Sequence, residues 1–157
     1  LGQLIGNPLH PSLAILSAAQ IDEKWNLNST KIPEKNLFLT GSGGANDIAS
    51  VASDIVVMMD GGSNKFVKQV PYITSPGDKV STIFTNLAVL MRTNVETFEV
   101  TAWIPHKFLV AEAFQQALRE LIPWKVPIRE NSVILDKPTD QELRWLRAFD
   151  PCQEFLH

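Results

Sequence analysis

The chain has 157 residues, of which 45% are hydrophobic and 20% charged, a balance that is ordinary for one globular domain. A formal net charge of −3 without a basic run argues against nucleic-acid binding. No run reaches the roughly 20 apolar residues of a transmembrane helix, so we expect no membrane span. The single cysteine, Cys152, excludes an internal disulfide and favours the cytoplasm, and no His, Cys and Asp spacing is typical of a metal site.

The first part of the chain predicts short strands and one helix. A continuous apolar run at 13–19 is typical of a strand that is buried on both faces, and a second strand is expected at 37–40. Small residues at 44–53 predict a short helix that packs closely on a sheet. The β-branched residues of 54–59 predict a buried strand.

The middle of the chain predicts further strands. Segment 66–73 alternates but contains Pro71, so we expect it at an edge or a bulge. Strands are also expected at 79–85, at 87–92 and at 97–104, the last two forming a hairpin. One face of the last strand is expected to carry Phe98, Val100, Ala102 and Ile104.

Two helices are expected towards the C-terminus. The apolar spacing from His106 to Leu121 fits an amphipathic helix. A capping box at 139–142 predicts the start of a last helix. The apolar face of that helix is expected to carry Leu143, Leu146 and Phe149. Together these elements predict an α/β domain with an open mixed or parallel sheet and flanking helices.

The segment 37–50 is the most informative part of the chain. A short apolar run enters a glycine-rich turn, and a helix of small residues follows. Glycine permits a tight turn and close approach of a ligand to backbone N–H groups, and a helix N-terminus favours an anion or a developing oxyanion. The pattern is neither G-x-G-x-x-G nor a P-loop, so a strand-to-helix turn without a ligand is the alternative.

Five segments, taken in chain order, resemble one known family. They are 17–22 (SAAQID), 26–30 (NLNST), 41–49 (GSGGANDIA), 70–77 (VPYITSPG) and 83–89 (IFTNLAV). The set is similar to the family I CoA-transferases, most of all to the β subunits of glutaconate CoA-transferase and its relatives. The pattern from Pro138 to Pro151 also resembles the end of that family, so the resemblance extends over nearly the whole chain.

The resemblance implies a fold of the NagB/RpiA/CoA-transferase type. It implies an enzyme that moves CoA between a short or dicarboxylic acyl-CoA and a free carboxylic acid. It also implies an α-type partner subunit in a heterodimer or heterotetramer, with coenzyme A as substrate and no metal.

The same resemblance leaves the catalytic nucleophile of this chain unassigned. In the family a glutamate is the nucleophile, upstream of the segment matched by Gln20 to Asp22, and no glutamate here occupies that context. The chain begins at Leu1 rather than at methionine, which indicates processing or truncation. We therefore expect a single β-type domain over 1–157 that lacks its N-terminal portion, which is either missing or carried on a separate polypeptide.

The resemblance also suggests two groups of site residues. The first is expected to line the cleft and consists of Gly41, Ser42, Gly43, Gly44, Ala45 and Asn46, with the backbone N–H groups of Gly43 and Gly44 as oxyanion donors. Asn46 is expected either to cap the helix or to contact substrate. Gln20 and Asp22 form the second group, because they point to one side of a strand, although they could instead hold the next loop. Trp25 stands where the family has a glycine, which alters this turn or adds a wall to a pocket.

Three alternatives to a transferase stay open from the sequence. Relatives in which the glutamate is replaced act as decarboxylases or hydrolases of CoA thioesters. A non-catalytic structural subunit is the second alternative, and a sugar-phosphate-binding protein of the same broad fold is the third.

Overall fold

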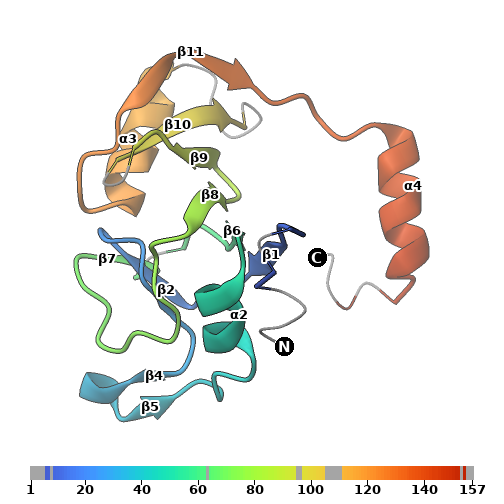
Figure 1. Cartoon of the computed structure of the whole chain (residues 1–157). Coiled ribbons are helices and arrows are strands. Elements are labelled where there is room, and N and C mark those ends of the chain that lie inside the picture. Colours follow the sequence, from blue (N-terminus) through green and yellow to red (C-terminus); the bar gives the residue numbers. More distant parts are fainter. Residues whose placement is uncertain are drawn as a thin grey trace.

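The structure, a computed structural model, describes residues 6–7, 9–62, 64–94, 97–104, 111–152 and 154. Its main element is a six-stranded sheet (Figure 1). In spatial order the sheet contains β1 (Leu13–Leu16), β6 (Asp54–Met58), β8 (Val80–Phe84), β9 (Ala88–Arg92), β10 (Phe98–Trp103) and β11 (Ile128–Ile134). β9 is antiparallel to both of its neighbours, and the other pairs are parallel. The predicted α/β architecture with an open mixed sheet is therefore confirmed.

Two smaller sheets precede or flank the main one. The first contains β3 (Leu27–Asn28), β2 (Gln20–Asp22) and β7 (Phe66–Val67), and the second contains β4 (Lys31–Ile32) and β5 (Leu37–Phe38). A short 3-10 helix, η1 (Pro33–Lys35), joins β4 to β5. β7 lies at an edge, as predicted for 66–73. The strand predicted at 37–40 forms as β5, but in the exposed two-stranded hairpin rather than in the main sheet.

Three α-helices complete the described fold. They are α2 (Ala45–Val51), α3 (Ala111–Leu121) and α4 (Asp140–Phe149). α2 confirms the predicted small-residue helix and buries Ala49. The predicted start of α3, at 106–110, lies outside the described residues. Within the described part of the chain, no helix is long and apolar enough to cross a membrane.

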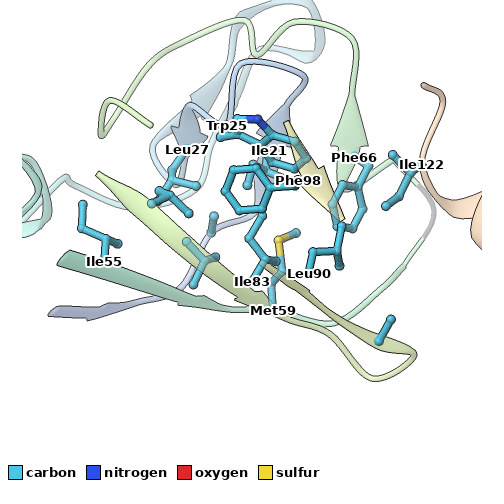
Figure 2. Close-up of a cluster of buried hydrophobic side chains, with 14 of the residues drawn as sticks. Ile21, Trp25, Leu27, Ile55, Met59, Phe66, Ile83, Leu90, Phe98 and Ile122 are labelled. Carbon is cyan, nitrogen blue, oxygen red and sulfur yellow. The ribbon is translucent and has the colours of Figure 1, made fainter. Parts of the chain in front are cut away.

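The hydrophobic core lies on one face of the main sheet, which we call the inner face. Val57, Ile83 and Leu90 stand side by side on it across β6, β8 and β9, and all three are fully buried. Figure 2 shows Ile83 and Leu90 packed below Trp25 and Phe98, whose ring centroids are 3.8 Å apart. α2 and α3 contribute buried side chains to this same core, so the inner face is covered.

The prediction that 13–19 forms a strand buried on both faces is wrong. β1 ends at Leu16, and only Ala14 of its side chains is fully buried, while Leu13 and Ile15 are 61% and 64% exposed. The reason is structural, since β1 is the edge strand of the described sheet and its second face is uncovered.

The alternation predicted for 97–104 is present in the burial of Phe98 to Trp103, but the register with the neighbouring strand is interrupted after Val100. A register shift between Val100 and Ala102 pairs Ala102 with Val89 and Trp103 with Ala88. Because neighbouring residues of a strand point to opposite faces, the bulge turns Ala102 outward and Trp103 inward. The Trp103 ring then stacks on Phe114 of α3 with centroids 4.9 Å apart.

α4 begins with the predicted capping box. The backbone N–H of Glu142 donates to Thr139 Oγ1 at 3.2 Å, and the Thr139 N–H donates to Glu142 Oε2 at 2.8 Å. The helix itself has no buried residue and stands apart from the main sheet (Figure 1).

We expect Thr139→Ala to raise the pKa of Glu142 part of the way towards its ordinary value. Hydrogen bonds from the backbone N–H and then from the hydroxyl of Thr139 hold this pKa below its usual range. Because the folded pKa is depressed, the carboxylate stabilises α4 above the unfolded pKa, and this contribution is lost as the pH falls through the folded pKa. Carboxyl NMR titration measures the shift. Thr139→Ser, which keeps the hydroxyl, should retain the low pKa, and identical titration in all three proteins would contradict the cap.

Candidate functional site

The glycine loop, residues 41–44, joins β5 to α2 and is exposed along its length. Gly43 has φ +53°, in the left-handed region that favours glycine. Gly44 is the N-cap of α2, without a side-chain capping bond, and Asn46 lies inside the helix. The alternative that Asn46 caps the helix is therefore wrong, because Gly44 occupies that position. Substrate contact by Asn46 stays a prediction.

The loop leaves a series of backbone donors unused. The N–H of Ala45 donates to Ser42 O at 3.0 Å. Among the described residues, none accepts a hydrogen bond from the N–H groups of 41–44. A Cβ at Gly41 or Gly43 would meet nothing within 4 Å, so neither glycine is required by packing. Four consecutive unpaired N–H groups in an open loop can donate to an external oxyanion.

Gln20 is connected to the start of this loop by buried hydrogen bonds. Its Oε1 accepts from Asn28 Nδ2 at 2.9 Å, and Asn28 Oδ1 accepts from the backbone N–H of Thr30 at 3.0 Å. The Thr30 carbonyl in turn accepts from the N–H of Leu39 at 2.8 Å. Gln20, Asn28 and Thr30 are all buried, so this chain of bonds fixes where the segment before the glycine loop begins.

Asp22 organises a second set of loops. Its Oδ1 accepts from the N–H groups of Lys24 and Asn26 at 3.0 Å, and its Oδ2 accepts from Asn26 Nδ2 at 3.3 Å and Val70 N at 3.2 Å. The side chain is buried and both oxygens are occupied. The geometry favours the role of holding adjacent loops, and ligand contact by Asp22 stays a prediction.

Trp25 resolves the two alternatives for its turn. Its φ of +67° keeps the left-handed backbone that a glycine would adopt. Its ring is buried in the core against Phe98 and Trp124, so it adds no wall to a pocket. Position 25 therefore has the left-handed backbone that favours glycine, although it carries a large side chain.

We expect Gly77→Ala to be strongly destabilising. A Cβ at Gly77 would overlap the carbonyl carbon and oxygen of Trp25, and backbone atoms cannot give way as a flexible side chain can. A loss of about 3 kcal/mol in unfolding free energy follows from such overpacking. Chemical denaturation measures it, with Gly62→Ala as control, because its nearest neighbour is the Lys65 side chain at 3.5 Å. Equal stability of the two variants would show that the loops at 25 and 77 are not in contact.

A pocket that the sequence patterns did not predict lies at the carboxyl ends of β1, β6 and β8. It has a volume of about 480 Å³, and we call it the carboxyl-edge pocket. Its walls are formed by Ser17, Ala18, Met58, Met59, Asp60, Lys65, Phe84, Thr85 and Asn86. Ligands of open α/β sheets bind at this edge. One sequence pattern could have indicated this pocket. Polar residues at positions 17, 60 and 85–86 directly follow three apolar strand segments.

Hydrogen bonds hold this pocket in shape. Asn86 Oδ1 accepts from the N–H of Gly61 at 2.9 Å, and Thr85 Oγ1 accepts from the N–H groups of Leu87 and Ala88. Asp60 and Lys65 form an ion pair at 3.8 Å across its rim. None of the predicted site residues is among its walls, so the structure does not bring the glycine loop and Asp22 into this pocket.

The described residues contain no cluster of three or more His, Cys, Asp or Glu side chains that could hold a metal ion. Cys152 is a free, exposed thiol.

No protein-family model matches the chain. The chain is 44% identical over 69 residues to the β subunit of glutaconate CoA-transferase from Acidaminococcus fermentans, a match that covers 41% of this chain and 25% of that protein. It is 27% identical over 164 residues to the β subunit of 3-oxoadipate CoA-transferase from Pseudomonas knackmussii, covering 92% of this chain and 61% of that protein. The chain thus spans less than two thirds of each of these relatives.

Two solved structures have a fold similar to that of this chain. The glutaconate coenzyme A-transferase of Acidaminococcus fermentans superposes with a TM-score of 0.78 at 25% identity, covering 92% of this chain and 61% of that chain. The decarboxylase AibA/AibB superposes with a TM-score of 0.71 at 17% identity, covering 91% of this chain and 58% of that chain, which shows a shared fold. The expected CoA-transferase-like fold is confirmed by the first of these.

Proposed function

We propose, on the premise that this chain is a relative of the β subunits of family I CoA-transferases, that it is part of a heteromeric CoA-transferase. The reaction would move CoA between a short or dicarboxylic acyl-CoA and a free carboxylic acid. The chain would be the C-terminal part of a longer β-type subunit, in one domain, and an α-type subunit would complete the enzyme in a heterodimer or heterotetramer.

The unpaired backbone N–H groups of the glycine loop are the observation that supports this function. Acyl transfer from a thioester passes through a tetrahedral species whose carbonyl oxygen becomes negative. N–H groups that have no other hydrogen-bond partner among the described residues can donate to that oxygen without first breaking a bond within the protein. We assign Gly43 and Gly44 as the oxyanion donors, with Gly41, Ser42, Ala45 and Asn46 lining the acyl-CoA cleft.

The buried network below the loop would supply positioning. Gln20 acts on the loop through Asn28 and Thr30 rather than by reaching into solvent. Asp22 acts on the turns at 24–26 and 70 in the same way. Both residues would keep the cleft in shape, and direct contact with CoA would require Gln20 or Asp22 to exchange a bond of this network.

The nucleophile is not assigned to this chain. In the reaction that the family resemblance implies, a glutamate oxygen bonds to the thioester carbon and the C–S bond breaks, which gives an acyl anhydride and CoA thiolate. The thiolate is a good leaving group, so a carboxylate suffices as nucleophile.

The reaction class is tested with the complete reading frame that encodes this chain, produced together with an α-type subunit. Mass spectrometry would follow a dicarboxylic acyl-CoA with acetate as acceptor. Acetyl-CoA together with the free dicarboxylic acid is the expected product. Loss of CO₂ from the acyl group would show a decarboxylase, free CoA a hydrolase, and absence of acyl-CoA binding a structural role; each would overturn the transferase proposal.

A further inference from the structure

The segments 26–30 and 70–77 lie next to each other in the structure, although they are distant in the sequence. The backbone N–H of Leu27 donates to Ser75 O at 2.9 Å, and the N–H of Thr74 donates to Leu27 O at 2.8 Å. The two segments therefore form one hydrogen-bonded unit, to which the proposed function assigns no role as a whole.

The hydroxyl of Thr74 is the central side-chain contact of this unit. Its Oγ1 accepts from the backbone N–H of Ser29 at 2.9 Å and lies 2.9 Å from Thr30 Oγ1, so the two hydroxyls share a hydrogen bond. Thr74 is 3% exposed and Thr30 is 8% exposed. Because water does not reach buried groups of this kind, a bond that is lost between them is not replaced by a bond to solvent.

Thr30 connects this unit to the chain that enters the glycine loop. Its carbonyl oxygen accepts from the backbone N–H of Leu39 at 2.8 Å, which closes the base of the β4–β5 hairpin. Only Thr40 separates Leu39 from Gly41, the first residue of the glycine loop. The position of Thr30 therefore determines where the glycine loop begins.

The β4–β5 hairpin contributes little to its own position. A two-stranded hairpin is at best marginally stable by itself, and η1 and β5 bury no side chain. Figure 1 shows the hairpin at the end of the fold that is remote from α3. Its base is therefore the place where the rest of the fold can fix it. A second contact acts in the same direction, since the Lys31 ammonium lies 4.5 Å from the centroid of the Tyr72 ring, in the segment that carries Thr74.

The segment that carries Thr74 is itself anchored to the main sheet. The guanidinium of Arg92, from β9, donates to Gly77 O at 2.7 Å and to Val80 O at 2.6 Å. The N–H of Gly77 donates to Asn26 Oδ1 at 3.2 Å. Because these bonds hold the end of the segment, Thr74 offers the hairpin a fixed point.

We propose that Thr74 is a positioning residue for the glycine loop, which acts through the hydroxyl of Thr30. The inference rests on the proposed function, in which the N–H groups of Gly43 and Gly44 are oxyanion donors. Such donors stabilise a transition state most when they are held in place before the reaction. An interaction made only in the transition state affects kcat rather than KM, so a contact that holds these donors should do the same.

Hydrogen exchange at the Leu39 amide measures this positioning. The experiment uses the product of the complete reading frame together with an α-type subunit, and mass spectrometry resolves single amides. Thr74→Val keeps the shape of the side chain but removes the acceptor of the Ser29 N–H, so we expect exchange at Leu39 to become about tenfold faster. Thr74→Ser, which keeps the hydroxyl, should stay within about twofold of the wild type. The Val100 amide, which donates to Pro127 O at 2.9 Å, is the internal reference and should not change.

Turnover gives the second readout in the same preparations. Thr74→Val should lower kcat for CoA transfer about tenfold, with KM for the acyl-CoA within about twofold of the wild type, whereas Thr74→Ser should retain the wild-type kcat. Thr30→Val removes the partner hydroxyl and should act as Thr74→Val does, so the proposal stays testable if Thr74→Val does not fold. Thr101→Val is the matched control, because it removes a part-buried hydroxyl that donates to Val89 O at 3.3 Å on the main sheet. It should change neither kcat nor exchange at Leu39.

Four results would overturn the proposal. Exchange at Leu39 that is unchanged in Thr74→Val or in Thr30→Val would show that the shared bond does not hold the hairpin. Equally faster exchange at Leu39 and Val100 would show a general loss of stability. Faster exchange at Leu39 with a wild-type kcat would show that the hairpin can move without consequence for the reaction, and a raised KM with an unchanged kcat would assign Thr74 to substrate binding. If the wild-type enzyme transfers no CoA, the proposed function fails, whereas exchange at Leu39 still decides whether Thr74 holds the loop.

Discussion

Replacement of Gly43 by valine is expected to abolish CoA transfer by the assembled enzyme while the protein stays folded. At φ +53° a β-branched side chain is strained, so the loop would leave its present conformation. The N–H groups of Gly43 and Gly44 would then leave the arrangement that the proposed oxyanion site requires. Loss of a single such donor lowers turnover by about 100-fold to 1000-fold, and displacement of two should exceed that.

The fold is expected to survive because the space around Gly43 is open. A Cβ there would meet nothing within 4 Å, so the penalty is confined to the loop backbone. Asn36→Val is the matched control, since Asn36 also has a positive φ, of +47°, and lies in the exposed connection between η1 and β5. Both variants should lose similar stability by chemical denaturation, but only Gly43→Val should lose turnover. Wild-type turnover in Gly43→Val would remove the site from this loop.

Local sequence patterns predicted most of the main sheet. The β-branched run at 54–59 and the alternation at 97–100 became β6 and the start of β10, since both patterns report burial next to a strand partner. The capping box at 139–142 could be predicted because its hydrogen bonds join only residues within that segment. The environment of β1 could not be predicted this way. Its apolar residues indicated cover on both faces, but whether a cover is present depends on chain outside the strand.

The site was predictable only in part for the same reason. The glycine loop was visible as a run of glycines, but its unpaired N–H groups depend on the turn at Ala45 and on the exposed β4–β5 hairpin before it. The carboxyl-edge pocket was missed because it requires the spatial order of β1, β6 and β8, which are distant in sequence. The bulge at Thr101 likewise depends on register with β9. Local sequence patterns predict individual strands and helices. The carboxyl-edge pocket, in contrast, depends on the order of β1, β6 and β8 in the sheet.

A large loss of stability is expected when Trp25 is replaced. Its ring is 4% exposed and packs against Phe98, with centroids 3.8 Å apart, and against Trp124 at 5.8 Å. Trp25→Ala should therefore lower the free energy of unfolding by about 4 kcal/mol, the usual cost of removing a large buried aromatic ring. Chemical denaturation followed by circular dichroism would measure it, because loss of an indole complicates fluorescence.

Glycine at position 25 separates the contribution of the ring from that of the backbone. Trp25→Gly removes the same ring but accepts the φ of +67° without strain, so it should be about 1 kcal/mol more stable than Trp25→Ala. Trp25→Phe keeps most of the packing and removes an indole N–H that has no partner among the described residues, so its loss should be the smallest of the three. Equal stability of the alanine and glycine variants would show that the left-handed turn is not present in solution. If Trp25→Phe instead lost as much unfolding free energy as Trp25→Ala, the contribution of Trp25 would come from its indole nitrogen. A hydrogen bond of that nitrogen, rather than packing of the ring, would then explain the tryptophan in this turn.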